Sequence, residues 1–150
     1  MAMEKIRRTV HVEAPPSKVY GYLLDPRNLP EIWPSMVEIT DLKTTPEGTP
    51  LGNDFTYKMA GVKFHGHTEI GDLERDRRIV WRSEGGIKST IRWTFSPHGS
   101  GTDVVDEVEY ELPASLLSRL AAPFLRRINE HEADACVNNL KARMEAPEPA

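Results

Sequence analysis

Cysteine is almost absent from this sequence, which holds only Cys136 among its 150 residues. One thiol cannot form a disulfide within the chain, and zinc sites built from several cysteines are excluded. A run of about 18 apolar residues is also missing, so no membrane-spanning helix is expected. The charged stretch Met1–Arg8 argues against a secretion signal. Together these absences favour a cytoplasmic protein held together by its hydrophobic core.

A strong excess of one charge sign is missing as well. The chain has 19 Lys and Arg against 23 Asp and Glu, mixed along its length, for a net charge of −4. A nucleic-acid-binding domain usually carries a basic stripe, so no nucleic-acid partner is expected. No repeat or linker divides the chain. We expect one domain over residues 1–146 and a disordered tail over residues 147–150, where two prolines preclude a helix.

Apolar and polar residues alternate in many short segments, which is the pattern of half-buried strands. The first such segment covers residues 4–14. Helical spacing over residues 17–24, and more briefly over residues 27–32, predicts two short helices next. Alternation then recurs from residue 35 to residue 112, interrupted by turns containing glycine or proline. Consecutive strands joined by short turns predict an antiparallel sheet with one polar face.

The last part of the chain, residues 114–146, contains no glycine and is rich in Ala, Leu, Arg and Glu. These are strong helix formers, so we expect one long helix here. Pro123 should kink this helix or leave an early short turn before it. One face of the helix is expected to pack on the sheet through Leu117, Leu120, Phe124 and Ile128.

Four stretches of the sequence resemble the START and polyketide-cyclase superfamily, also called SRPBCC. They are Val10–Tyr20, Asp25–Pro34, Gly101–Pro113 and Asn139–Lys141. The resemblance implies an α+β helix-grip fold, with a seven-stranded antiparallel curved sheet wrapped around a long C-terminal helix and two short helices after the first strand. It also implies a cavity for lipids, aromatic polyketides or other hydrophobic molecules. No cofactor is expected, because the metal triad and iron–sulfur module of the oxygenase branch are not found.

The strand positions predicted to face the helix supply the candidate ligand-binding residues. Aromatic rings with a few hydroxyl groups are the usual lining of a small-molecule site. The alternative, that these side chains fill a solid core, stays open. The candidates are Phe55, Tyr57, Met59, Phe64, Thr68, Trp81, Ile91, Trp93, Asp106, Val108 and Tyr110 from the strands, and Leu117, Leu120, Phe124 and Ile128 from the helix.

Asp106 stands out because it takes the inward position between Val104 and Val108. A buried carboxylate is costly unless it is paired, protonated or near an opening. Arg8 has the inward position on the first strand, which the resemblance places beside the last strand. We therefore hypothesise an ion pair between Arg8 and Asp106. It would anchor a ligand, supply general acid–base chemistry, or only stabilise the rim of the cavity.

The other chemically active residue types give weaker indications. Tyr57 and Tyr110 join Asp106 as candidate catalytic residues, with His131 on the same predicted helix stripe. His65, His67 and Glu69 share a strand face, but residues four apart on a strand lie about 13 Å from each other, too far for one metal ion. His11 and His98 are interpreted as surface residues. Cys136 is interpreted as a buried, inert thiol.

Three functions are compatible with these features. The first is a carrier or sensor that binds a hydrophobic small molecule in an internal cavity. The second is an enzyme similar to polyketide cyclases or dehydratases, which hold a substrate in a shaped cavity and supply few polar groups. The third, a protein–protein module, is disfavoured by the polar outer face of the strands.

Overall fold

The computed structural model describes residues 3–85 and 87–147. The strands are β1 (Glu4–Val12), β2 (Met36–Thr44), β3 (Pro50–Met59), β4 (Val62–Glu74), β5 (Arg78–Glu84), β6 (Ser89–His98) and β7 (Gly101–Tyr110). The helices are α1 (Pro16–Leu24), α2 (Leu29–Ile32), α3 (Ala114–Leu117) and α4 (Ala122–Glu145), with a 3-10 helix η1 (Pro26–Asn28) between α1 and α2. Parts of the predicted turn at Gly85–Gly86 and of the predicted tail, residues 86 and 148–150, lie outside the described residues.

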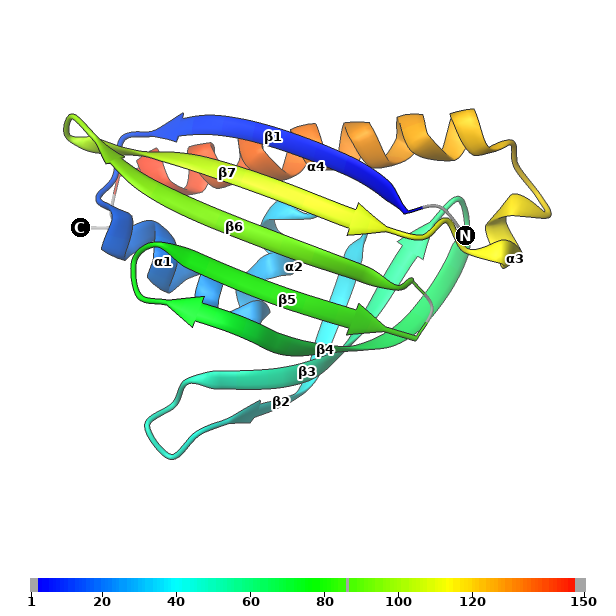
Figure 1. Ribbon diagram of the computed structural model, residues 1–150, viewed down its shortest axis with the longest axis horizontal. Helices are drawn as coiled ribbons and strands as arrows, with labels where there is room; N and C mark the ends of the chain where they lie inside the picture. Colours follow the sequence, from blue (N-terminus) through cyan, green and yellow to red (C-terminus); the bar gives the residue numbers. More distant parts are fainter. Residues whose placement is uncertain (1–2, 86, 148–150) are drawn as a thin grey trace.

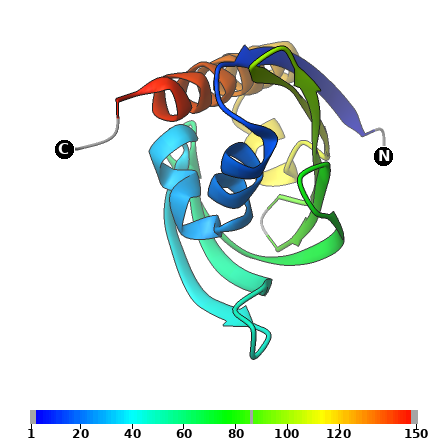
Figure 2. The same cartoon turned by 90° about the vertical axis from the view of Figure 1, so that its left-hand side faces the viewer.

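The seven strands form one sheet in the order β1-β7-β6-β5-β4-β3-β2, and every neighbouring pair is antiparallel. Only β1 joins the sheet out of chain order, beside β7. Figure 1 shows α4 running along β1, and Figure 2 shows the sheet curling around α1 and α2. The predicted helix-grip arrangement of a curved antiparallel sheet and a long C-terminal helix is confirmed.

The two N-terminal helices start and end where proline dictates. Pro16 occupies the first turn of α1, where its missing N–H costs nothing. The helix ends at Asp25, because the residue before Pro26 disfavours helical backbone. The Asp25 side chain then accepts a hydrogen bond from the Arg27 backbone N–H and caps η1. The short helices predicted from spacing are therefore present, close to their predicted limits.

The C-terminal helix differs from the prediction in one respect. Residues 114–146 do not form one continuous helix, because residues 118–121 separate α3 from α4. Pro123 lies in the first turn of α4, where a proline is favoured, whereas deeper in a helix it would clash with the preceding turn. The expected short turn before Pro123 is thus α3. The break resets the helical phase, so one apolar stripe does not continue from α3 into α4.

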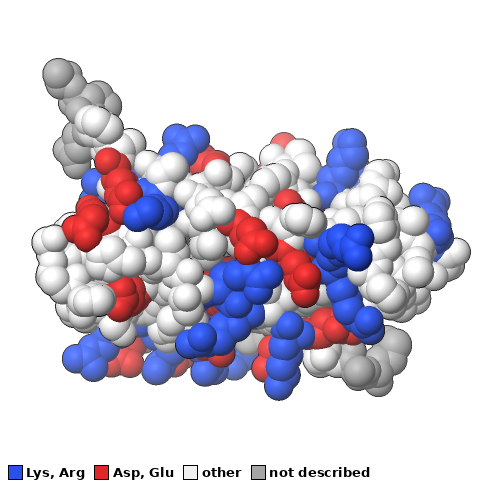
Figure 3. Space-filling model, turned by 90° about the horizontal axis from the view of Figure 1, so that it is seen from above, with Lys and Arg blue, Asp and Glu red and all other residues white. Residues whose placement is uncertain are grey.

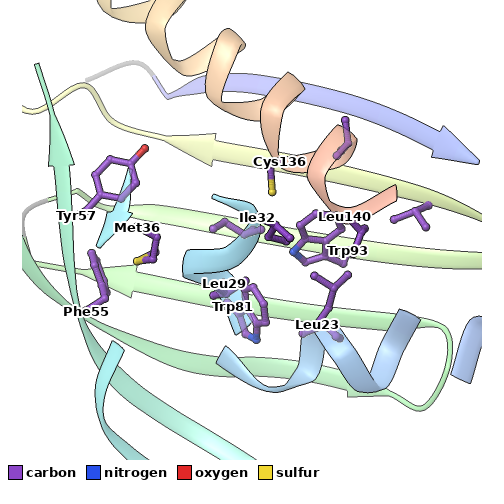
Figure 4. Packing of buried hydrophobic residues seen from close by; sticks show 14 of the residues in the cluster. Leu23, Leu29, Ile32, Met36, Phe55, Tyr57, Trp81, Trp93, Cys136 and Leu140 are labelled. Carbon is purple, nitrogen blue, oxygen red and sulfur yellow. The ribbon is translucent and has the colours of Figure 1, made fainter. Parts of the chain in front are cut away.

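The concave face of the sheet is solidly filled at one end, which we call the packed half. It is formed by Leu23 of α1, Trp93 and Phe95 of β6, Val104 of β7 and Leu140 of α4, all 4% exposed or less. Tyr20 of α1 meets Phe95 edge to face, with ring centroids 6.2 Å apart. Figure 4 shows Leu23, Trp93 and Leu140 grouped together, while Phe55 and Tyr57 stand apart on β3.

The outward surface is mixed in charge. On the face that carries β1 and α4, acidic and basic side chains are interspersed (Figure 3). Several of them pair, for example Lys141 with Glu145 at 2.7 Å and Arg126 with Glu4 at 2.9 Å. That no nucleic acid binds stays a prediction.

Candidate functional site

A cavity lies between the first half of α4 and the other end of the concave face, which we call the hollow half. The space that the centre of a water molecule can occupy is about 70 Å³, and the whole atom-free volume, including the opening to solvent, is about 660 Å³. The walls are mostly apolar, with a few polar groups among them. The lining residues are Ile6, Trp33, Met36, Phe55, Tyr57, Ser83, Ile87, Ser89, Ile91, Asp106, Val108, Tyr110, Asn129, Glu132, Ala133 and Cys136.

The alternation of β7 brings three of these side chains to the cavity. Successive side chains of a strand point to opposite faces, so Asp106, Val108 and Tyr110 share the inner face. Asp106 lies opposite Trp93 on one side and opposite Arg8 on the other. A carboxyl group therefore marks the boundary at which the packed half gives way to the hollow half.

Asp106 is the most perturbed acid of the cavity. Its side chain is buried, the residue is 4% exposed, and its Oδ1 has no hydrogen-bond partner among the described residues. Burial raises the pKa of Asp106 to about 7, opposed by the charge of Arg8 and reinforced by Glu107. Near neutral pH this carboxyl group is present in both protonation states, so it can donate or accept a proton.

The hypothesised ion pair between Arg8 and Asp106 is wrong, although their backbone positions are paired as expected. Arg8 instead donates from Nε to Asp134 Oδ1 of α4 at 2.6 Å. Because α4 lies along β1, it offers Arg8 a carboxylate that remains partly in water. Pairing there avoids the desolvation that a buried ion pair would require. Arg8 still acts on Asp106 through its charge alone.

Two phenols provide neutral polar groups in the same cavity. Burial raises the pKa of Tyr57 above its usual range, and the charge of Glu132 adds to this. Burial also raises the pKa of Tyr110, while the side chain of Asn129 lowers it. Both hydroxyl groups thus stay protonated at neutral pH and can hydrogen-bond a ligand. Trp33 packs edge-on against Tyr57, with ring centroids 6.1 Å apart, and fixes its orientation.

Helix α4 contributes a carboxylate and a thiol. Glu132 accepts a hydrogen bond at Oε1 from the backbone N–H of Ser35, 2.8 Å away, which ties α4 to the start of β2. The pKa of Cys136 is raised by burial first and then by the negative charges of Asp106 and Glu132. A thiol with a raised pKa remains protonated and is a poor nucleophile, which agrees with the interpretation of Cys136 as inert.

The predicted strand residues divide between the two halves. Phe55, Tyr57, Ile91, Asp106, Val108 and Tyr110 line the cavity. Met59, Phe64, Trp81 and Trp93 point inward and are buried, but they belong to the core and not to the cavity wall. Thr68 is half-buried, and its hydroxyl hydrogen-bonds the Ser83 hydroxyl at 2.9 Å, so it lies behind a lining residue.

The predicted helix residues do not line the cavity. Leu117 and Phe124 are 41% and 50% exposed, and Leu120 and Ile128 pack only partly against the core. His131 is exposed as well. The structure does not place these residues on the cavity wall, because the break before α4 turns a different face inward. That face carries Asn129, Ala133 and Cys136, with Leu140 further along.

Several lining residues were not among the candidates. Ser83 and Ser89 have the inward parity of their strands, so alternation could have predicted that they face the cavity. Their small polar side chains did not suggest a role in ligand binding. Ile6 also has the inward parity of its strand. Nothing in the sequence indicated that Asn129 and Glu132 line the cavity, because the direction of their side chains depends on the break between α3 and α4.

The histidine pair on β4 lies on the outer face. His67 hydrogen-bonds Asp54 through Nδ1 at 2.9 Å, and His65 hydrogen-bonds Thr56 at 3.2 Å. Each imidazole thus has its own partner on β3, which agrees with a polar outer face.

The chain as a whole matches one known protein family. The family model for "Polyketide cyclase / dehydrase and lipid transport" matches residues 3–145, nearly the whole chain. The chain therefore belongs to this family. No curated protein sequence matches the chain significantly.

Solved structures show the same fold at low sequence identity. A START superfamily protein from Mycobacterium smegmatis superposes with a TM-score of 0.78 at 16% identity, covering 94% of this chain and 97% of that one. A protein from Thermus thermophilus gives 0.76 at 20% identity, with 94% and 97% covered. The Zhui aromatase/cyclase from Streptomyces sp. R1128 gives 0.75 at 18% identity, with 96% and 94% covered. Within the described residues, no helix has the length and apolar character needed to cross a bilayer.

Proposed function

We propose that this protein binds a small, mainly apolar molecule in the hollow half, as a carrier or sensor. The ligand would bear a hydroxyl or carbonyl oxygen that pairs with Asp106. The observation that carries the proposal is a buried carboxyl oxygen without a partner in a mainly apolar cavity. An orphaned buried polar group costs free energy, and a ligand oxygen that hydrogen-bonds it would remove this cost. The family description, which includes lipid transport, supports the same function.

The size of the cavity limits how a ligand enters. A cavity volume of about 70 Å³ is smaller than the roughly 150 Å³ cavity that accepts benzene in another protein. Binding of a larger molecule thus requires the wall to move. We expect the first half of α4 to move, because it forms one wall of the cavity through Asn129, Ala133 and Cys136. Residues 118–121, which precede it, are not helical and provide a hinge.

The test combines native mass spectrometry with a cavity-filling variant. We expect freshly purified protein, or protein incubated with the neutral dye N-phenylnaphthylamine, to hold one small molecule per chain. Ala133→Phe should abolish this uptake by placing a ring in the cavity. Ala142→Phe, on the exposed side of the same helix, is the matched control and should bind normally. Uptake that is absent in the unmodified protein, or equal in both variants, would contradict the proposal.

A second function, catalysis similar to that of a polyketide cyclase or dehydratase, is favoured by the pKa of Asp106 near 7. A general acid–base group works best when its pKa lies near the working pH. The Tyr57 and Tyr110 hydroxyl groups line the same cavity and would hold substrate oxygens. The likeness to an aromatase/cyclase is of fold only, but it makes poly-carbonyl substrates a sensible first choice for assay.

Asp106→Asn distinguishes binding from catalysis. Asparagine keeps the shape of the aspartate side chain but lacks its titratable proton. If the protein only binds, this variant should change the affinity by about tenfold or less, the value of one hydrogen bond. If it catalyses, turnover of a candidate substrate should fall by about a hundredfold or more while affinity changes little.

A further inference from the structure

A second polar cluster lies on the outer face of the sheet, away from the cavity. His11 of β1, Asp103 of β7 and His98 at the end of β6 meet there. One ligand atom from each residue lies within 4.8 Å of the other two. The Asp103 carboxylate joins the histidines, with Oδ1 2.8 Å from His11 Nδ1 and Oδ2 2.9 Å from His98 Nδ1. The two imidazole rings are edge to face, with centroids 5.3 Å apart.

The strand register explains why these three residues meet. His11 and Asp103 are direct cross-strand partners, and Ser96 on β6 lies opposite Asp103. His98 follows Ser96 by two residues, so it is on the same face of β6 and one step nearer the turn. Three adjacent strands therefore present their side chains at one corner of the sheet. A sheet corner is a rigid frame, and rigid frames hold ligand atoms better than loops do.

Gly101 makes room for the cluster. A Cβ atom at this position would lie 2.9 Å from two atoms of the His11 ring and 2.4 Å from the Val12 carbonyl oxygen. The His11 ring thus rests over the backbone of Gly101, which any other residue would block. This close approach fixes the ring with Nδ1 directed toward Asp103.

Glu13 holds the other nitrogen of His11. Its Oε1 accepts a hydrogen bond from His11 Nε2, and its Oε2 accepts one from the Ser100 hydroxyl at 2.7 Å. Because carboxylates only accept, the His11 ring donates from both nitrogens here, and the two carboxylates raise the pKa of His11. A histidine whose far nitrogen donates to a carboxylate is the usual arrangement of a metal ligand.

We propose that His11, His98 and Asp103 form a binding site for one divalent transition-metal ion of the zinc class. Two imidazoles with one carboxylate suit zinc, cobalt or nickel better than magnesium or calcium. The ion would replace the proton on Nδ1 of each histidine, and Glu13 would keep its hydrogen bond from His11 Nε2. Water would complete the coordination.

The three ligand atoms, which lie within 4.8 Å of one another, must rearrange around the ion. Ligand atoms around a tetrahedral zinc ion with bonds of 2.0–2.1 Å lie about 3.3 Å apart. The present hydrogen bonds of 2.8 and 2.9 Å are shorter, so Asp103 and the two rings must separate by about half an ångström. His98 is exposed and His11 half-buried, so both can make this movement. Bound there, the ion would link β1, β7 and β6.

The test is a titration of the untagged full chain with zinc chloride at pH 8, followed by isothermal calorimetry. Cobalt(II) absorption provides a second readout of the coordination. We expect one ion per chain, with release of protons, and a loss of affinity of about tenfold or more in His98→Ala and in Asp103→Asn. The matched control is His67→Ala, which removes an outer-face histidine that also pairs with carboxylates.

The control should bind zinc as the unmodified protein does. If the unmodified chain takes up no zinc, or if His67→Ala weakens binding as much as His98→Ala, the proposal is overturned. Circular dichroism of each variant checks folding. Should Asp103→Asn fail to fold, His98→Ala alone decides the result, because His98 is an exposed residue at a strand end.

Discussion

The two halves of the concave face share the strands of one sheet and helix α4, yet one is solid and the other hollow. On β5, buried Trp81 is followed two residues later by Ser83, and on β7, buried Val104 is followed by Asp106. Helix α4 shows the same contrast, with Leu140 on the solid side and Ala133 on the hollow side. The sheet and α4 are continuous across the boundary, so the cavity results from smaller and more polar side chains together with the absence of α1 from this end.

This comparison shows where the fold obtains its stability and where it keeps room for a function. The packed half holds large apolar side chains that exclude water, each stabilising the fold by roughly 1.5–3 kcal/mol. The hollow half gives up part of this burial and retains an acid that prefers to be protonated. A cavity that costs stability is typical of a site used for binding.

The largest expected effect lies at the boundary. Because the pKa of Asp106 is raised from 3.8 to about 7 in the folded state, the folded protein keeps this proton between those pH values while the unfolded chain loses it. Stability must therefore fall as pH rises from 4 to 7, by about 4 kcal/mol from this group. Asp106→Asn should match the unmodified protein at pH 4 and exceed it by about 4 kcal/mol at pH 8 in urea denaturation.

The control for this prediction is Glu109→Gln, which removes an exposed carboxyl group of the same strand that does not act on Asp106. It should leave the pH dependence unchanged. A gap between Asp106→Asn and the unmodified protein that does not grow with pH would show that Asp106 has an ordinary pKa.

The packed half should be sensitive to loss of volume. Leu140 is fully buried, so Leu140→Ala removes contacts and leaves a cavity, at a cost of about 2–5 kcal/mol. Urea denaturation at fixed pH measures the change in the free energy of unfolding. Arg143→Ala, on the exposed side of the same helix, should cost under about 1 kcal/mol. Similar losses for both variants would remove the distinction between the halves.

Added side-chain volume should destabilise the packed half more than the hollow half. Ala14 is buried near the packed half, and Ala14→Leu should cost about 1–3 kcal/mol because no room exists there. Ala133→Leu enlarges a side chain beside open space and should change stability by less than about 1 kcal/mol. If Ala133→Leu destabilises the protein as strongly as Ala14→Leu, the cavity is too small to accept added volume, and the distinction between the two halves is wrong.

The smallest effect concerns Arg8, which acts on Asp106 only through its charge. Arg8→Gln breaks a partly exposed ion pair with Asp134, worth about 0.2–1 kcal/mol. It should also raise the pKa of Asp106, since the positive charge of Arg8 lowers it. The pH at which half of this stability is lost should therefore increase. Lys5→Gln, which breaks a still more exposed pair with Glu109, should leave this pH unchanged.

The sequence predicted the sheet well because a strand's period of two leaves a clear pattern. The inward parity of Tyr57, Trp93 and Tyr110 followed from alternation. The position of Arg8 beside Asp106 followed from parity together with the strand order that the family resemblance implies. The helix face could not be predicted in the same way. Pro123 starts a new helix there, and the angle between α3 and α4 depends on packing that no local pattern records.

The candidate site was predictable only in part for a similar reason. Which inward residues line a cavity, and which fill the core, depends on how far α1 and α2 extend over the sheet. Trp81 and Trp93 have the same parity as Ile91, yet only Ile91 reaches the hollow. The His11 and His98 cluster was not expected either, because its members are distant in sequence and meet only through β7.

The most direct test follows the Asp106 carboxyl group itself by carbon-13 NMR during a pH titration, with and without bound N-phenylnaphthylamine. A midpoint near pH 7 that shifts when the dye binds is the expected result, because the dye would enter the cavity that Asp106 lines. A midpoint near the ordinary value of about 4, or one that does not respond to a dye bound at one molecule per chain, would contradict the account.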